Sequence, residues 1–173
     1  MKKLLISVLL ILFSLPLFAQ HKHSYQQGIT PTEVGQSNFA AVAEIVEILR
    51  NDKKTNWDSV DIDALREHLV DMNNLMNHSR ASTITSNEAI TFEVSGESNT
   101  IDSIQRMVLA HAPMLANETG WKINTQKTNN GANISIQSED MSLVKGLGFY
   151  GIMTIGAHHQ AHHLMIATGS NPH

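Results

Sequence analysis

Four histidines lie close together near the end of the 173-residue sequence, in segment 158–163, which reads HHQAHH. If this segment is helical, residues four apart stack on one face of the helix. The stacked pairs are then His158 with His162 and His159 with His163. Two imidazoles one helical turn apart can chelate a single cation. The segment therefore predicts a metal-binding site, with a solvated polar helix end as the alternative.

Two further histidines have methionine neighbours at helical spacing and fall inside apolar arcs. Met72 follows His68 by four residues, whereas His111 follows Met107 by four and precedes Met114 by three. A single inward histidine is more often a core residue that finds a hydrogen bond, and methionine rows often fill cores. The combination of these residues with the histidine-rich segment nevertheless predicts one shared site. We expect His68 and His111 to face each other, or to face the last helix, in the interior.

The types of ligand favour copper. Thioethers suit Cu(I), imidazoles suit copper in either state as well as zinc, and no cysteine is present to supply a thiolate. A haem held by His and Met ligands is an alternative cofactor, and zinc is another. The candidate ligands are His68, Met72, Met107, His111, Met114, His158, His159, His162 and His163.

No catalytic motif accompanies these ligands. The sequence lacks His-Glu-x-x-His, a Gly-x-Ser-x-Gly elbow, a phosphate-binding loop and a dinucleotide fingerprint. We therefore favour a binding protein, a copper carrier, buffer or sensor, and leave enzymatic activity undecided. The alternatives are a metal- or haem-dependent periplasmic enzyme and a protein-interaction module that responds to pH through its histidines.

The N-terminus predicts export. Lys2 and Lys3 precede an apolar run over residues 4–13, and Ala19 provides a small residue for cleavage. The run is too short for a membrane anchor, so residues 1–19 are interpreted as a signal peptide and the protein as periplasmic or secreted. Polar residues 20–36 show no periodicity, which indicates a flexible linker.

The start of the exported chain leaves a choice open. A free amine followed by His21 at the second position can chelate Cu(II), and cleavage one residue later would place His23 third. The alternative is a solvated tail without a role in binding.

The composition of the sequence limits the kinds of partner that the protein can bind. The formal charge is −4 and basic runs are absent, which argues against nucleic acid because its phosphates require clustered Lys and Arg. No transmembrane segment is expected after removal of the signal peptide. The predicted partner is a metal ion.

The periodicity of apolar residues predicts one globular metal-binding domain over 37–173. The expected helices cover 37–50, about 61 through Met76, about 100–118, and 139–167 with an interruption near 146–148; the expected strands lie around 90–94, 121–125 and 134–136. The order α-α-β-α-β-β-α predicts an α+β fold, a small, mostly antiparallel three-stranded sheet covered by helices.

The last predicted helix carries no charged residue after Lys145. A helix that is apolar on all sides is usually buried, so we expect it to be central. Gly148, Gly151 and Gly156 fall on one side of it, which predicts close approach by another backbone.

Overall fold

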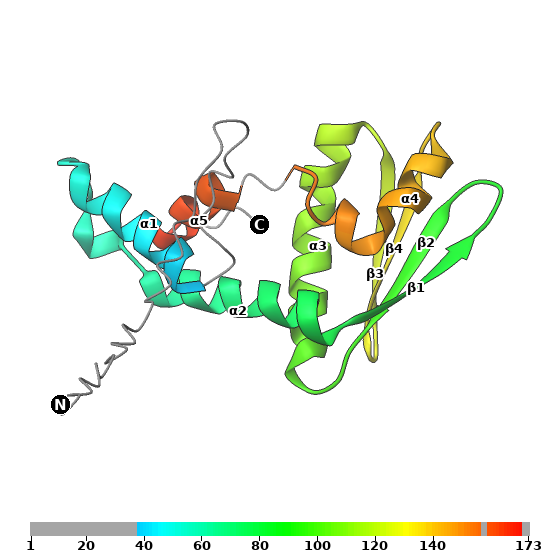
Figure 1. The fold of residues 1–173 in the computed structure, drawn as a ribbon, viewed down its shortest axis with the longest axis horizontal. Coiled ribbons are helices and arrows are strands. Elements are labelled where there is room, and N and C mark those ends of the chain that lie inside the picture. Colours follow the sequence, from blue (N-terminus) through cyan, green and yellow to red (C-terminus); the bar gives the residue numbers. More distant parts are fainter. Residues whose placement is uncertain (1–37, 157–158, 171–173) are drawn as a thin grey trace, which may run out of the picture. The chain divides into compact units, whose positions relative to one another are not determined.

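The computed structural model describes residues 38–156 and 159–170, all within the compact unit of residues 33–173 (Figure 1). The predicted signal peptide, the predicted linker, and His21 and His23 lie outside the described residues.

A four-stranded antiparallel sheet forms one part of this unit. Its strands are β1 (Arg80–Thr85), β2 (Ile90–Ser95), β3 (Lys122–Thr128) and β4 (Gly131–Gln137), in the spatial order β1-β2-β4-β3. Phe92 of β2 pairs with Ile134 of β4, and the alternate residues on both sides of this pair are buried. Since side chains alternate between the faces of a strand, one face of the sheet carries the core.

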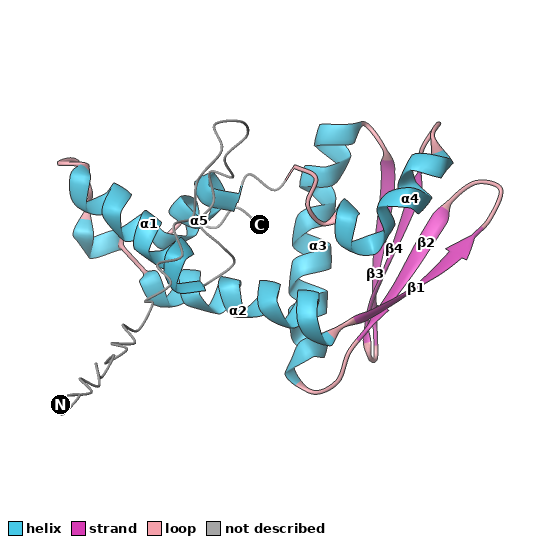
Figure 2. Ribbon diagram, viewed as in Figure 1, coloured by secondary structure: helices cyan, strands magenta, loops and turns pink. Residues whose placement is uncertain are grey.

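Helices α3 (Asn99–Thr119) and α4 (Met141–Ile152) cover that face (Figure 2). Ile104, Val108 and Leu115 of α3 and Val144, Phe149 and Ile152 of α4 are buried in one cluster with the apolar residues of β2 and β4. Tyr150 of α4 also reaches the start of β1, where its hydroxyl donates to the carbonyl oxygen of Ser79 at 3.0 Å.

A second, smaller core holds the remaining helices together. Helix α1 (Asn38–Asn51), helix α2 (Ile62–His78) and helix α5 (His159–Ala167) meet there, and a short 3₁₀ helix, η1 (Trp57–Ser59), lies between the first two in sequence. The buried residues of this cluster are Ile45, Leu49, Leu65, Leu69, Ile166 and Ala167. The Asp61 amide donates to the Ala167 carbonyl at 2.8 Å, which joins the start of α2 to the end of α5.

The predicted α+β class with an antiparallel sheet covered by helices is confirmed, but the three-stranded sheet is wrong. The additional strand is β1, and the order in the described residues is α-α-β-β-α-β-β-α-α. All six residues of β1 are exposed, and β1 is an edge strand of the sheet. Strand β1 therefore lacks the alternation of buried and exposed residues by which strands are predicted.

The interruption predicted near 146–148 within the helical region 139–167 is present, because Gly148 has non-helical backbone angles, but the region also divides into two helices, α4 and α5, after Ile152. Gly148 adopts φ 63° and ψ 178° inside α4, and Gly156 adopts φ 71° after it, both in regions that favour glycine. A Cβ atom on Gly148 would have no neighbour within 4 Å, so close backbone approach does not explain this glycine. Of Gly148, Gly151 and Gly156, only Gly156 lies near another backbone, at Met114 of α3.

No helix within 38–156 and 159–170 combines the length and apolar character needed to cross a membrane.

Candidate metal centre and adjoining pocket

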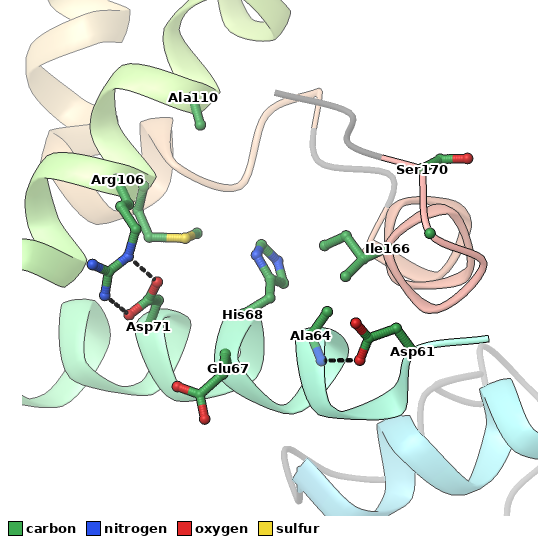
Figure 3. Close-up of a pocket in the computed structure, with 11 residues that line it drawn as sticks. Asp61, Ala64, Glu67, His68, Asp71, Arg106, Ala110, Ile166 and Ser170 are labelled. Carbon is green, nitrogen blue, oxygen red and sulfur yellow. Dashed lines mark hydrogen bonds and ion pairs between the residues drawn. The ribbon is translucent and has the colours of Figure 1, made fainter. Parts of the chain in front are cut away.

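Helix α2 fixes the position of His68. The helix begins at Asp61, whose carboxylate accepts the Ala64 amide at 2.8 Å, a standard N-cap that satisfies a free backbone donor. Leu65 and Leu69 are buried against α1 and α5. His68 lies between these two anchors in sequence, and its ring is directed from α2 towards the side where α5 lies (Figure 3).

Helix α5 brings two of the four clustered histidines to the same place. The ring centroid of His68 is 4.8 Å from that of His162 and 5.5 Å from that of His163, and the two rings on α5 are 6.5 Å apart. His163 is buried, and its Nε2 atom is shielded from solvent. Three imidazoles from two helices therefore form a contiguous group, which we call the histidine cluster (His68, His162 and His163).

These separations match the scale of a metal site, although the side chains do not form one as they stand. Three imidazoles bound to one ion at about 2.0–2.1 Å place their ring centres roughly 5 Å apart in a tetrahedral site. Among the residues that the structure describes, no group of three or more His, Asp or Glu is arranged so that it could hold a metal ion. Metal binding by the cluster would thus require the rings to reorient about their side-chain torsions.

His111 lies elsewhere in the fold. It is buried on α3, and its Nε2–H donates to the carbonyl oxygen of Ile152 at the end of α4, 3.3 Å away. A proton on Nε2 leaves Nδ1 as the nitrogen that could accept a hydrogen bond or bind a metal. Both His68 and His111 thus face the region predicted as the last helix, but His68 contacts α5 and His111 contacts α4.

The candidate methionines lie in three different places. Met107 of α3 lines a pocket together with His68, whereas Met72 packs into the core of α1, α2 and α5. The backbone of Met114 lies near Gly156, beyond the end of α4. His158 lies outside the described residues, and His159 begins α5 with its side chain outside the description.

A hydrogen-bonded ion pair borders the histidine cluster one turn along α2. Arg106 donates to both carboxylate oxygens of Asp71 through Nε and Nη2, each at 2.7 Å. The Ser103 hydroxyl donates to the same carboxylate at 2.8 Å. This network joins α2 to α3, and so connects the small helical core to the core beneath the sheet.

This network shifts the pKa values of Asp71 and Arg106. Burial raises the pKa of Asp71, but hydrogen bonds from Arg106 and Ser103, with the positive charges of Arg106 and His68, outweigh burial and hold this pKa below its ordinary value. The hydrogen bond to Asp71 raises the pKa of Arg106 above its ordinary value. Asp71 is therefore an ionised carboxylate at neutral pH.

The pocket itself has a volume of about 430 Å³ and lies between α2, α3 and the end of α5 (Figure 3). His68 belongs to its wall, along with small or apolar side chains and four charged ones. The lining residues are Asp61, Ala64, Glu67, His68, Asp71, Arg106, Met107, Ala110, Ile166, Gly169 and Ser170.

Sequence reasoning found His68 and Met107 in this wall but missed Asp71 and Arg106. A signal for Asp71 existed, because it follows His68 by three residues and precedes the buried Leu75 by four, on the inward side of α2. Arg106 offered no comparable signal, since its side chain is mostly exposed and only its head group reaches Asp71.

Comparison of the chain with protein-family models, with curated proteins and with solved structures finds no match.

Proposed function

We propose that this protein binds a metal ion through the histidine cluster and that copper is its cargo, with the protein acting as a carrier, buffer or sensor. The observation that carries the proposal is the convergence of His68 from α2 with His162 and His163 from α5. Coordination of one ion by these neutral imidazoles would require them to rotate about their side-chain torsions, of which the second is broad in histidine.

The composition of the surroundings supports a borderline or soft ion over a hard one. Nitrogen donors dominate the cluster, a thioether lies in the adjoining pocket wall, and the nearest buried carboxylate, Asp71, is engaged by Arg106. Magnesium and calcium prefer oxygen ligands, whereas copper and zinc accept imidazole. Copper is favoured over zinc on the single ground that Met107 contributes a thioether to the pocket wall that also holds His68.

We further propose that the protein is exported to the periplasm or secreted, on the basis of residues 1–19 alone. N-terminal mass analysis of the protein recovered outside the cytoplasm should find Gln20 first. Retention of Met1 to Phe18 in that material would contradict export by cleavage.

The direct test is equilibrium competition for Cu(II) and Zn(II) between a chromophoric chelator and the protein, prepared without a histidine tag. His68→Gln and His162→Gln should each weaken binding by at least about tenfold, since even residues behind the ligands change affinity by that much. His78→Gln is the matched control, because His78 ends the same helix but is exposed. Equal effects of all three substitutions, or no binding by the unaltered protein, would contradict the proposal.

The same close packing supports a second candidate, a protein-interaction module that responds to pH. Protonation of two or three imidazoles with centroids 4.8–6.5 Å apart would make α5 and α2 repel each other. The neighbouring carboxylates of Asp61, Glu67 and Asp71 would weaken this repulsion, and the positive charge of Arg106 would add to it. This candidate predicts release of α5 at acidic pH in protein that binds no metal. Metal binding at neutral pH distinguishes the two functions.

A further inference from the structure

The two edges of the sheet differ in their protection against pairing with a further strand. An edge strand presents backbone amides and carbonyls without a strand partner, and proteins usually protect it with lysine, proline, a bulge or an inward charge. At one edge, β3 carries the exposed Lys122 and Lys127. At the other edge, β1 reads RASTIT and pairs with β2 in continuous register, without a bulge (Figure 2). Arg80, at its first position, is its only charged residue, so the rest of β1 lacks such protection.

The hydrogen-bond phase of the sheet determines which backbone groups of β1 point outward. In an antiparallel pair, opposed residues alternate between those that exchange backbone hydrogen bonds and those that do not. In the turn after β1, the Ser86 amide donates to the Ala89 carbonyl at 2.9 Å, in the register that continues through the two strands. Alternation from this pair directs the even-numbered residues of β1 to β2 and the odd-numbered ones to the outer side. The outward residues are Ala81, Thr83 and Thr85.

We infer that β1 is a self-association edge, at which a second copy of this chain pairs antiparallel through its own β1 and extends the sheet. The pairing is centred on Thr83, which faces Thr83 of the second copy across a twofold axis. In this register Ala81 of each copy faces Thr85 of the other, so that all outward backbone groups of β1 gain partners. Addition of a strand to a sheet edge is a recurring mode of association, and twofold dimers are the commonest homo-oligomers. The inference does not depend on metal binding.

The charges at the two ends of β1 favour the antiparallel orientation. Arg80 begins the strand and Glu88 lies in the turn after its end, and both side chains are exposed. In the register centred on Thr83, Arg80 faces Ser86 of the second copy, in the turn that also holds Glu88. Opposite charges therefore meet at both ends of the paired strands. A parallel arrangement would instead bring like charges together, which is destabilising.

The side chains of β1 also suit pairing with a second copy. The Ser82 hydroxyl donates to the Glu93 carboxylate at 3.3 Å, which places Ser82, and Ile84 two residues later, on the face of the sheet that carries Glu93. Ile84 is 50% exposed. The register sets Ile84 opposite Ser82 of the second copy and diagonal to its Ile84, within reach of an apolar contact. On the other face, Thr83 opposes Thr83, a favourable cross-strand pair.

Sedimentation velocity over a series of protein concentrations tests the inference, with a chelator present so that no metal bridges two copies. The unaltered protein should dimerise as its concentration rises. Thr83→Lys opposes two like charges across the twofold axis and should raise the dimer dissociation constant by at least about tenfold. Gln126→Lys adds the same charge at an exposed position of β3 and, as the matched control, should leave the constant unchanged. A protein that stays monomeric throughout, or equal effects of the two substitutions, would overturn the inference.

Charge complementation tests the register and separates weaker pairing from failure to fold. Thr83→Glu should weaken self-association as Thr83→Lys does, since two carboxylates then oppose each other. An equimolar mixture of the two variants should dimerise at least as tightly as the unaltered protein, because unlike charges then face each other across the pair. A mixture that associates no better than either variant alone would overturn the pairing centred on Thr83.

Discussion

The imidazole of His68 on α2 packs against the imidazole of His162 on α5, with ring centroids 4.8 Å apart and planes inclined by 52°. The two helices are separated in sequence by the whole sheet, α3 and α4, and also share the apolar contacts of Leu65, Leu69 and Ile166. An interaction between these rings is therefore an interaction between α2 and α5. Any ion or proton that the rings accept will change how firmly α5 is held.

Binding of Cu(II) should protect α5 from amide hydrogen exchange. The helix has nine residues, shorter than the roughly 12–15 that sustain an isolated helix, so its stability depends on its contacts. A metal joining His68 to His162 would add a link between α5 and α2, and a ligand at a hundred times its dissociation constant stabilises the folded state by about 2.7 kcal/mol. Exchange mass spectrometry should show slower exchange in α5 and the first turns of α2, and no change in β2 and β4. Protection spread evenly over the sheet would contradict a local link.

Copper affinity should fall as the pH decreases below about 6.5, because imidazole coordinates only when neutral and its ordinary pKa lies there. The slope of log Kd against pH should approach one for each coordinating histidine. His68→Gln should therefore make the slope shallower as well as weaken binding, whereas His78→Gln should do neither. Chelator competition between pH 5 and 8 measures both quantities, and a pH-independent affinity would exclude imidazole ligands.

Asp71→Asn should reduce the free energy of unfolding by about 1–3 kcal/mol at neutral pH, since it removes the carboxylate that accepts from both Arg106 and Ser103. The folded pKa of Asp71 is lowered, so its stabilising effect is present above the unfolded value of about 3.9 and is lost as the pH falls through the folded value. Denaturant unfolding should show a constant difference from the unaltered protein above about pH 5, which shrinks in acid.

Glu47→Gln, at an exposed position of α1, is the control for charge removal and should change stability by less than about 0.5 kcal/mol. A difference between Asp71→Asn and the unaltered protein that persists undiminished at acidic pH would show that the effect does not arise from the ionised carboxylate.

Two glycines of the same helix should respond in opposite directions to alanine. Gly148→Ala should destabilise by about 1–3 kcal/mol, because φ 63° with ψ 178° is a conformation almost restricted to glycine. Gly146→Ala should stabilise by about 0.5–1 kcal/mol, because a Cβ atom there has open space and alanine is the better helix former. Thermal unfolding of the two variants measures both effects, and equal stability would refute the break that the structure places within α4.

The helices and strands that could be predicted from sequence are those with one apolar side. Helices α1, α2 and α3 and strand β2 bury a regular stripe, such as Ile90, Phe92 and Val94, and periodicity detects such stripes. Strand β1 exposes every residue and pairs with β2 at the edge of the sheet, so no pattern of buried side chains reports it. The division of the last helix depends on positive φ values at Gly148 and Gly156, and a glycine in sequence does not state which conformation it adopts.

The candidate site could be predicted in part, because periodicity also indicates which single residues lie on the inward face of a helix. Helical spacing placed His68 on an inward face, and a run of four histidines marked α5 as unusual. Nothing local indicated that α5 would meet α2 while α4 met His111, because that depends on where the chain turns between the two helices. The pairing of Asp71 with Arg106 is likewise tertiary, joining residues on two helices that only the fold brings together.

Met107→Leu should weaken Cu(I) binding more than Met72→Leu or Met114→Leu. Met107 shares the wall of the pocket with His68, whereas Met72 packs among the apolar residues of the small helical core. Leucine conserves the size of methionine and usually costs little stability, so a change in affinity would report the loss of sulfur.

Met76→Leu, at an exposed position of α2, is the matched control. Competition with a Cu(I)-specific chelator under reducing conditions, alongside Zn(II) titration, gives the comparison. Thioether sulfur is soft and prefers Cu(I), so Zn(II) affinity should be unchanged by Met107→Leu. A different result is that the Met107→Leu and Met76→Leu variants bind Cu(I) equally well while binding still depends on His68. That result would support an imidazole site and remove the argument for copper over zinc.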